Sequence, residues 1–415
     1  MEKALIVKVY NRENESELAS AVDEMKGLIM TAGGEVAGVV MQKKSFISPA
    51  FYIGRGKAIE IAGEYGGKID LAVFDTELKP VQVKNLEDTI GIRVIDRTQL
   101  ILDIFSRRAH TSEGKLQVEH AQLSYLLPRL TGRGADLMQQ TGGIGTRGPG
   151  ETKLEVDRRR IKQRLQRIKS ELETVRAGRL RQRERRKSVP VPLVAIVGYT
   201  NAGKTMLLNR LTGAGMLSED MLFATLDPKI KRFRLPSGYS VLFSDTVGFI
   251  RDLPTHLVAA FRATLEEVVE ADVILHVIDA GTEGFRERTA TVNSILSDIG
   301  ALKGKPVIEV FNKSDLVDGS LRQSVFSGTG RLLISAKTGE GISGLLERIE
   351  AAVSSGFKER EIKVTRHNES AAGIFYEEGI VTGREDTNDG IILRVKCLQK
   401  TYDRYFSAVK KGNEA

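Results

Sequence analysis

Short apolar runs alternate with helical periodicity over the first quarter of the chain. Between residues 3 and 110, runs such as ALIVKVY, EVAGVVM, IDLAVF and GIRVID are separated by stretches in which apolar residues recur every three or four positions. The runs are typical of strands, and the stretches between them are typical of amphipathic helices. Because strands that alternate with helices form parallel sheets, the pattern predicts an N-terminal α/β domain over residues 1–110.

A different periodicity covers residues 111–189. The stretch 112–130 has a helical pattern, and a second helical pattern follows a segment, 131–150, whose seven glycines disfavour a helix. We therefore predict a coiled-coil-like helical hairpin with a glycine-rich loop at its tip, and we expect Gly178 and the polar run RLRQRERRKSVP after it to end its second helix. A heptad seam runs along that second helix, through Leu154, Ile161, Leu165, Ile168, Leu172 and Val175.

Strand-like runs return in the second half of the chain. Over residues 190–356 the runs PLVAIVG, VLFSDTVG, DVILHVIDA and KPVIEVFNK again alternate with helical stretches, which predicts a second parallel α/β domain. Residues 357–415 contain further strand-like pieces and several aromatic residues. We expect them to form a small C-terminal α/β module.

Composition narrows the class of protein. The 415 residues are 41% hydrophobic and 28% charged, as in an ordinary globular protein of several domains. Cys397 is the single cysteine, so an intramolecular disulfide and a multi-cysteine metal site are excluded. No run approaches the roughly 18 consecutive apolar residues of a membrane span. We therefore expect a cytoplasmic monomer without membrane insertion.

The positive charge is concentrated in one segment. The formal net charge is +8, yet residues 151–187 alone hold 15 basic and 6 acidic residues, a local balance of +9. The rest of the chain is thus close to neutral. A cationic helix beside a glycine-rich loop fits contacts with the phosphates of folded RNA, although a solvated charged face is the simpler reading. The candidate RNA or ribosome contacts are Arg133, Arg147, Arg158, Arg159 and Arg160.

The segment GYTNAGKT follows the strand VPLVAIV and opens a helix, and it matches the phosphate-loop pattern G-x-x-x-x-G-K-[ST]. Its glycines allow backbone N–H groups to wrap phosphates, and Lys204 can reach the β- and γ-phosphates. The hydroxyl of Thr205 can bind Mg²⁺. The loop residues are Gly198, Tyr199, Thr200, Asn201, Ala202, Gly203, Lys204 and Thr205.

Two further motifs complete a guanine-nucleotide site. The run DTVG ends a strand, so Asp245 lies near the metal and the Gly248 amide can meet the γ-phosphate. In NKSD, the carboxylate of Asp315 can accept two hydrogen bonds from guanine, which adenine does not offer, so GTP is favoured over ATP. The remaining candidate nucleotide ligands are Thr246, Val247, Asn312, Lys313, Ser335, Ala336 and Lys337.

The run LFATLDP lies between the phosphate loop and DTVG. Thr225 is its candidate switch threonine, a third Mg²⁺ ligand beside Thr205 and Asp245, and Phe223 and Ala224 are candidate nucleotide contacts. We assign the catalytic roles to Lys204, Thr225 and Gly248. The GTPase template places a water-orienting Gln after D-x-x-G, but Phe249 stands here, which predicts slow hydrolysis without a partner.

These residues together resemble the HflX-type family of translation-factor-related GTPases. The resemblance extends to GGIGTRGPGETKLEVDRRRI, FATLDP and DTVGFIRDLPTHLVAAFRATLEEV, and it covers roughly residues 1–355. It implies a Mg²⁺-dependent GTPase that binds GTP and GDP, is stimulated by the large ribosomal subunit and splits or rescues stalled ribosomes. Lys229 and Ile230 depart from the family pattern, which commonly has hydroxyl residues there.

Alternatives remain open at this point. The chain could instead assist ribosome assembly, or be a signalling switch that acts on a protein effector. Asn201 resembles the phosphate-loop Asn of potassium-activated GTPases, so K⁺ is a second candidate cofactor, although an Asn that stabilises the loop is the simpler interpretation.

Overall fold

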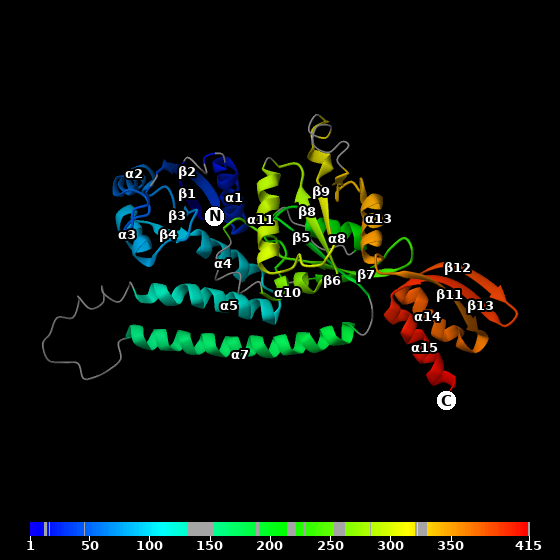
Figure 1. The fold of residues 1–415 in the computed structure, drawn as a ribbon. Coiled ribbons are helices and arrows are strands. Elements are labelled where there is room, and N and C mark those ends of the chain that lie inside the picture. The colour runs from blue at the N-terminus through cyan, green and yellow to red at the C-terminus, as the bar shows by residue number, and fades with distance from the viewer. Residues whose placement is uncertain are drawn as a thin grey trace. The chain divides into compact units, whose positions relative to one another are not determined.

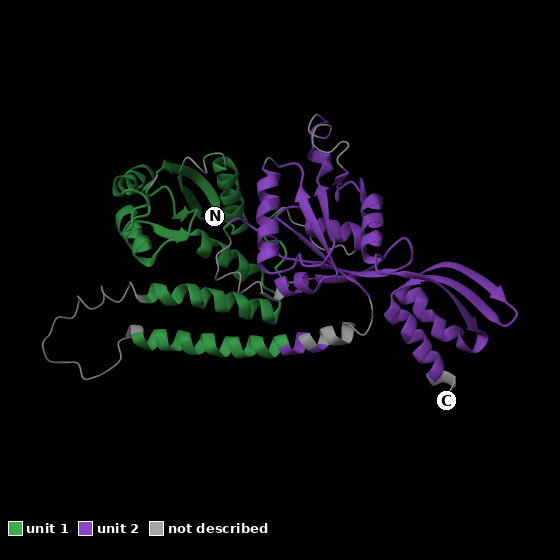
Figure 2. Ribbon diagram, viewed as in Figure 1, with its two compact units in different colours: residues 1–176, 219–227, 252–262 green, residues 177–218, 228–251, 263–415 purple. Residues whose placement is uncertain are grey.

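The computed structural model contains two compact units. Unit 1 comprises residues 1–176, 219–227 and 252–262, and unit 2 comprises residues 177–218, 228–251 and 263–415 (Figure 2). The structure describes residues 1–11, 15, 17–44, 46–131, 153–187, 191–213, 221–226, 229–252, 262–282, 284–319, 322 and 330–413. None of the helices it describes is long and apolar enough to span a membrane.

Unit 1 is built around a parallel sheet with the strand order β2-β1-β3-β4 among its described residues. The strands are β1 (Lys3–Tyr10), β2 (Glu35–Lys43), β3 (Leu71–Phe74) and β4 (Arg93–Asp96). They alternate along the chain with α1 (Leu18–Thr31), α2 (Arg55–Tyr65), α3 (Pro80–Ile90) and α4 (Arg97–Arg108) (Figure 1). This is the parallel α/β domain that the apolar pattern predicts.

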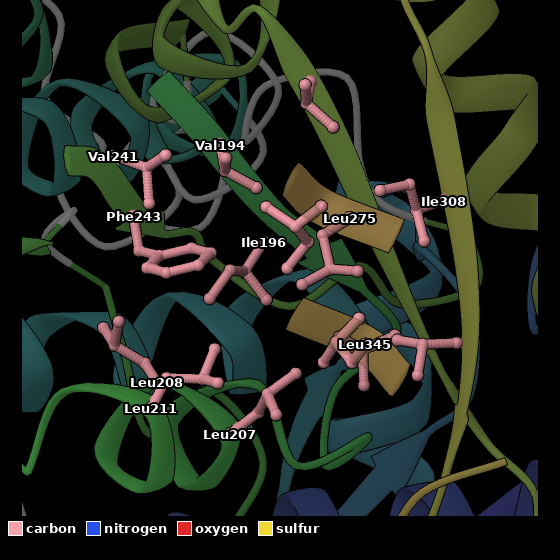
Figure 3. Close-up of a cluster of buried hydrophobic side chains, with 14 of the residues drawn as sticks. Val194, Ile196, Leu207, Leu208, Leu211, Val241, Phe243, Leu275, Ile308 and Leu345 are labelled. Atoms are coloured by element: carbon pink, nitrogen blue, oxygen red, sulfur yellow. The ribbon is translucent and has the colours of Figure 1, made fainter. Parts of the chain in front are cut away.

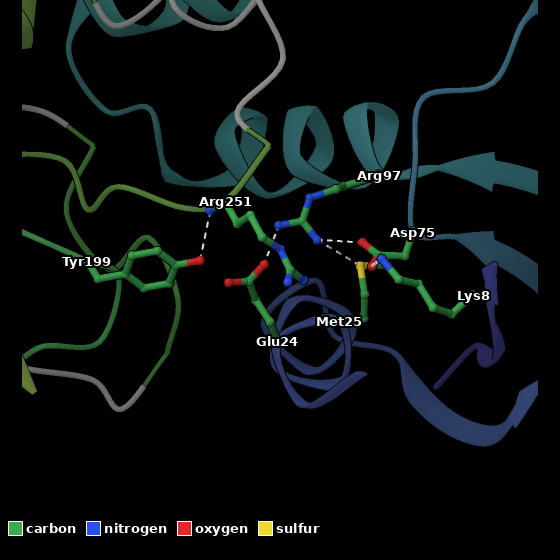
Figure 4. A network of polar contacts seen from close by, with 7 residues as sticks. All are labelled: Lys8, Glu24, Met25, Asp75, Arg97, Tyr199 and Arg251. Atoms are coloured by element: carbon green, nitrogen blue, oxygen red, sulfur yellow. Dashed lines mark hydrogen bonds and ion pairs between the residues drawn. The ribbon is translucent and has the colours of Figure 1, made fainter. Parts of the chain in front are cut away.

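A buried ion-pair cluster lies at the carboxyl edge of this sheet. Arg97 donates to Asp75 Oδ1 at 2.6 Å and also pairs with Glu24, and Lys8 pairs with Asp75 Oδ2 at 2.5 Å (Figure 4). Because every one of these charged side chains has an opposite charge beside it, the cluster offsets the cost of burying them. It joins α1, β1, β3 and α4.

The helical hairpin is formed by α5 (Ser112–Leu126) and α7 (Lys153–Lys187), with the 3₁₀ turn η1 (Leu127–Thr131) after α5. The two helices lie side by side in Figure 1. Arg164 donates to both carboxylate oxygens of Glu119 at 2.7 Å. Ile168 of the heptad seam is completely buried, and the seam positions 161, 165, 172 and 175 are half-buried.

The expectation that Gly178 and the polar run after it end this helix is wrong, because α7 continues through Gly178 and most of that run to Lys187. A glycine inside a helix costs only about 1 kcal/mol relative to alanine. The residues after it, RLRQRERRK, are mostly Arg, Lys, Gln and Glu, which are good helix formers. Their summed propensity outweighs the single glycine.

Unit 2 contains the second sheet, with the order β10-β9-β8-β5-β7-β6 among its described strands. All neighbours are parallel except β6 and β7, which are antiparallel. The strands are β5 (Leu193–Gly198), β6 (Lys229–Arg234), β7 (Ser240–Asp245), β8 (Val273–Asp279), β9 (Val307–Asn312) and β10 (Leu332–Leu333). The helices are α8 (Lys204–Thr212), α10 (Arg262–Glu270), α11 (Phe285–Asp298) and α13 (Ile342–Val353), with the 3₁₀ turn η2 (Ser314–Leu316).

One face of this sheet carries an extensive apolar core. Side chains from β5, β7 and β8 pack against Leu207, Leu208 and Leu211 of α8 and Leu345 of α13 (Figure 3). On the other face, Phe285 at the start of α11 packs edge-on against Phe311 at 5.9 Å. The sheet is therefore covered on both faces, as parallel sheets require.

A three-stranded antiparallel sheet follows, with the order β11-β13-β12. It consists of β11 (Lys358–Thr365), β12 (Gly379–Thr387) and β13 (Gly390–Cys397), with α14 (Glu369–Glu378) and α15 (Gln399–Asn413) as helices and η4 (Arg366–Asn368) as a 3₁₀ turn. Phe357, just before β11, packs edge-on against Tyr239 at 5.0 Å. The predicted fold class, with its GTPase, N-terminal, hairpin and C-terminal parts, is confirmed.

Replacing Ile168 by Ala should loosen the hairpin. Ile168 is the one fully buried seam residue on the described part of α7, so the truncation leaves a cavity and should cost about 2–5 kcal/mol. Hydrogen exchange of the full chain should then show faster exchange in α5 and α7. Ile161→Ala, at a half-buried seam position, is the matched control and should have a smaller effect. Equal effects of the two substitutions would contradict the assignment.

Candidate nucleotide-binding site

The phosphate loop connects β5 to α8, and two glycines give it its shape. Gly198 has φ +154° and Gly203 has φ +87°, conformations that L side chains rarely adopt. A Cβ at Gly198 would overlap the carbonyl oxygen of Val277, and one at Gly203 would overlap the side-chain amide of Asn312. The pattern G-x-x-x-x-G-K-T thus reflects close backbone approach at both ends of the loop.

Lys204 lies inside this loop. Its Nζ donates to the carbonyl oxygens of Gly198 at 3.1 Å and Tyr199 at 2.8 Å. Burial lowers the pKa of Lys204 to about 8, and the nearby Asp245 carboxylate opposes that shift. A buried ammonium group favours an anionic ligand, because an anion restores the stabilisation that the charge has lost with its water.

Thr205 and Asp245 bring two hard oxygen donors together. The Thr205 hydroxyl donates to Asp245 Oδ2 at 2.8 Å, and Asp245, at the end of β7, is completely buried. Mg²⁺ prefers oxygen ligands and keeps several waters, so one hydroxyl with a carboxylate behind it fits this ion. The donor set is therefore compatible with the predicted magnesium site.

The DTVG segment lies directly on the phosphate loop. Thr200 N donates to Phe249 O at 2.7 Å, and Phe249 N donates to Gly198 O at 3.1 Å. A Cβ on Gly248 would lie 2.7 Å from Thr200 Cγ2, so this close approach requires a glycine. Phe249 itself is buried, at the position where the GTPase template has its water-orienting Gln.

Tyr199 makes a further link to this segment, one that the sequence motifs do not indicate. Its hydroxyl accepts a hydrogen bond from Arg251 N at 2.8 Å (Figure 4). The guanidinium group of Arg288 lies 5.1 Å from the centre of the Tyr199 ring. The second residue of the phosphate loop thus connects the loop to residues 249–251 and to α11.

Asn312 links the NKSD motif to two other motifs. Its Nδ2 donates to Ala202 O at 2.9 Å, and its Oδ1 accepts from Ala336 N at 2.9 Å. Ser335 donates to Asp315 Oδ1 at 2.6 Å, which fixes one carboxylate oxygen. The structure therefore brings the phosphate loop, NKSD and SAK into one place.

Three supporting residues escaped the sequence reasoning. Asp279, at the end of β8, pairs with Lys313 at 2.8 Å, and Arg210 donates to the carbonyl oxygens of Ala336, at 3.1 Å, and of Lys337. Glu340 accepts from Ser314 at 2.6 Å, which lowers the pKa of Glu340. Asp279 could have been found from its position at the end of a strand-like run, whereas nothing in the sequence indicates Arg210 or Glu340.

The switch residues belong to unit 1. Phe223 is buried with φ +56° and packs edge-on against Phe105 at 4.7 Å, and Thr225 is also buried. Leu222 N donates to the Thr31 hydroxyl at 3.2 Å. That Thr225 joins Thr205 and Asp245 around Mg²⁺, and that Phe223 and Ala224 contact the nucleotide, therefore stay predictions.

Three of the five candidate RNA contacts lie within the described residues. Arg133 and Arg147 lie outside the described residues. On α7, Arg159 and Arg160 are exposed and Arg158 is half-buried. Arg160 lies 3.8 Å from the carboxylate of Asp157, a distance typical of a weak surface ion pair.

This fold and this site define a P-loop GTPase. Family models match the chain in four successive parts: the GTP-binding GTPase N-terminal region (19–106), the GTP-binding GTPase middle region (108–186), the 50S ribosome-binding GTPase (193–313) and the HflX C-terminal domain (320–404). The chain belongs to the GTPase HflX family, and like its relatives it is a GTPase.

Curated relatives agree with this assignment, and the chain is also similar to a solved structure. GTPase HflX of Caldanaerobacter subterraneus is 50% identical over 87% of this chain and 82% of its own length. GTPase HflX of Escherichia coli is 40% identical over 91% and 88%. A GTP-binding protein of Sulfolobus solfataricus in complex with GDP is 26% identical, covers 86% of this chain and 99% of its own, and has a TM-score of 0.43.

Gly198→Ala should abolish nucleotide binding, because its Cβ would displace Val277 or distort the loop. Gly213→Ala is the matched control. Gly213 ends α8 with φ +64°, but a Cβ there would meet no atom within 4 Å, so only backbone strain of about 1 kcal/mol is expected. Affinity for a fluorescent GDP analogue should be lost in the first variant and retained in the second. Retention in both would refute the steric argument.

Proposed function

We propose that this GTPase binds the large ribosomal subunit, that the subunit stimulates its hydrolysis of GTP, and that the GTP-bound protein splits or rescues stalled ribosomes. The observation that carries the proposal is the match of residues 193–313 to the 50S ribosome-binding GTPase model. A cationic helix, α7, precedes this domain in the same chain. Its arginines supply the phosphate contacts that binding to ribosomal RNA needs.

Each nucleotide ligand has a role in this proposal. Lys204 binds the β- and γ-phosphates, and the Gly248 N–H donates to the γ-phosphate. Thr205 and Asp245, joined by their 2.8 Å hydrogen bond, hold Mg²⁺ together with Thr225. Magnesium, when bound, neutralises charge on the phosphate oxygens. Asp315, held by Ser335, accepts the two guanine N–H groups.

Slow intrinsic turnover follows from Phe249. A phenyl ring cannot orient the attacking water, and the backbone of Phe249 is already hydrogen-bonded to the phosphate loop. A partner that reorders this segment or supplies polar groups can raise the rate by about 10³–10⁵. We propose the large ribosomal subunit as this partner. We further propose that the protein is a monomer and that it acts in the cytoplasm.

Asn201 of the phosphate loop is the candidate ligand for K⁺. Asn201 has φ +61°, a left-handed conformation that Asn tolerates better than most residues. That geometry alone accounts for an Asn at this position. Coordination of K⁺ by Asn201 stays a prediction.

Co-sedimentation with isolated large ribosomal subunits tests the partner. With a non-hydrolysable GTP analogue, the chain should pellet with large subunits, and binding should weaken steeply as salt increases. GTP turnover should increase when subunits are added. If the chain does not pellet, or if turnover with and without subunits is equal, the ribosomal role fails. A requirement for immature subunits would instead favour ribosome assembly, and capture of a protein effector would favour a signalling switch.

Asp315→Asn should change the base specificity. The side-chain amide of Asn cannot accept hydrogen bonds from both guanine N–H groups, as the carboxylate does, so GTP affinity should fall about a hundredfold. Its NH₂ group can donate to the O2 atom of xanthine, so xanthosine triphosphate should become the better ligand. Calorimetric titration with both nucleotides measures the change. Asp298→Asn, an exposed carboxylate on α11, is the control and should behave like the unaltered protein.

A further inference from the structure

The edge strand β6 of the unit 2 sheet is strongly cationic. Its six residues, KIKRFR, include Lys229, Lys231, Arg232 and Arg234, and all four are exposed. The segment from Lys229 to Tyr239 contains no acidic residue. Because neighbouring strand positions point to opposite faces, the cations lie on both sides of the strand.

These cations lack acidic partners. Among the residues that the structure describes, none of the four pairs with a carboxylate, and Arg234 donates only to the backbone oxygen of Gly238, at 3.0 Å. The C-terminal sheet of the same unit is different. There Arg384 pairs with Asp386 at 3.0 Å and Arg394 with Glu361 at 3.5 Å. The positive charge of β6 is thus left for an external anion.

Protection of a sheet edge does not account for so much charge. Charged residues, lysines in particular, prevent another chain from pairing with an edge strand, but β6 carries two arginines as well as two lysines. Here Phe233 anchors the middle of the strand, at 5.9 Å from Phe243, while four charges face solvent around it. Lys229 and Lys231, like Arg232 and Arg234, are about 6–7 Å apart along the strand. Such regular spacing suits an extended polyanion.

We propose that β6 is an RNA-binding edge, which contacts the phosphates of an RNA strand through Lys231, Arg232 and Arg234. The inference rests on the proposed function, because ribosomal RNA is the polyanion that a ribosome-bound protein meets. Arginine favours this ligand, since its planar guanidinium group binds phosphate oxygens in pairs.

The test compares two variants of the full chain with equal loss of charge. Lys231→Gln/Arg232→Gln removes two cations from β6. Lys303→Gln/Lys363→Gln removes two exposed cations elsewhere in unit 2 and is the matched control. GDP affinity, which should match that of the unaltered protein in both, reports correct folding. The probes are a fluorescent 20-nucleotide poly(U) RNA and isolated large ribosomal subunits, each titrated over a salt series.

With poly(U), the slope of log affinity against log salt should become shallower by about 1.4 in the β6 variant, because each phosphate contact on a single strand contributes about 0.7. The control should keep the slope of the unaltered protein. If the β6 variant keeps it too, the RNA-binding edge is refuted and the cations only protect the strand. If polyglutamate of equal charge displaces the RNA from the protein, β6 binds acidic proteins, and this result would also overturn the proposal.

The ribosome titration separates this inference from the proposed function. If the unaltered protein does not pellet with large subunits but the poly(U) slopes differ as expected, the ribosomal role fails and the RNA-binding edge stands. If the protein pellets and the β6 variant behaves like the control with both probes, the ribosomal role stands and the edge fails.

Discussion

The side-chain amide of Asn312 holds the nucleotide site together. It donates to the phosphate loop at Ala202 and accepts from Ala336, so one buried group spans three segments that are more than a hundred residues apart at their extremes. Both partners are backbone groups, which fixes the loops and not merely their side chains. The same amide lies so close to Gly203 that no larger residue fits there. Without these hydrogen bonds, the buried amide would destabilise the fold by the full free energy of removing it from water.

Backbone hydrogen bonds to residue 249 also hold the phosphate loop. Hydrogen bonds between Thr200, Phe249 and Gly198 tie it to the segment that should sense the γ-phosphate. Lys204 is buried between these backbone groups with a lowered pKa, so a phosphate would stabilise its charge. The site is thus prepared for an anion, whereas Phe249 supplies nothing that orients water. This combination predicts nucleotide binding with slow intrinsic hydrolysis.

Charged side chains are arranged differently inside unit 1 and on the surfaces of β6 and α7. In unit 1, the cluster of Lys8, Asp75 and Arg97 neutralises itself inside the fold. On β6, by contrast, the exposed cations have no carboxylate partner within the part of the chain that the structure describes. Arg159 and Arg160 of α7 are also exposed, and Arg160 lies 3.8 Å from the carboxylate of Asp157. Much of the exposed positive charge is thus found on α7 and on β6, where it can contribute to the proposed binding of RNA.

The sequence by itself determined the fold class and the motifs of the site, because strand and helix periodicity are local and phosphate loops need glycines at fixed spacing. The periodicity also indicated the seam around Ile168, but it misplaced the end of α7, where many good helix formers outweigh Gly178. Only the tertiary structure paired Asp279 with Lys313, placed Arg210 against Ala336 and put the cationic strand β6 at a sheet edge, since contacts between distant segments and strand order are encoded in no local pattern.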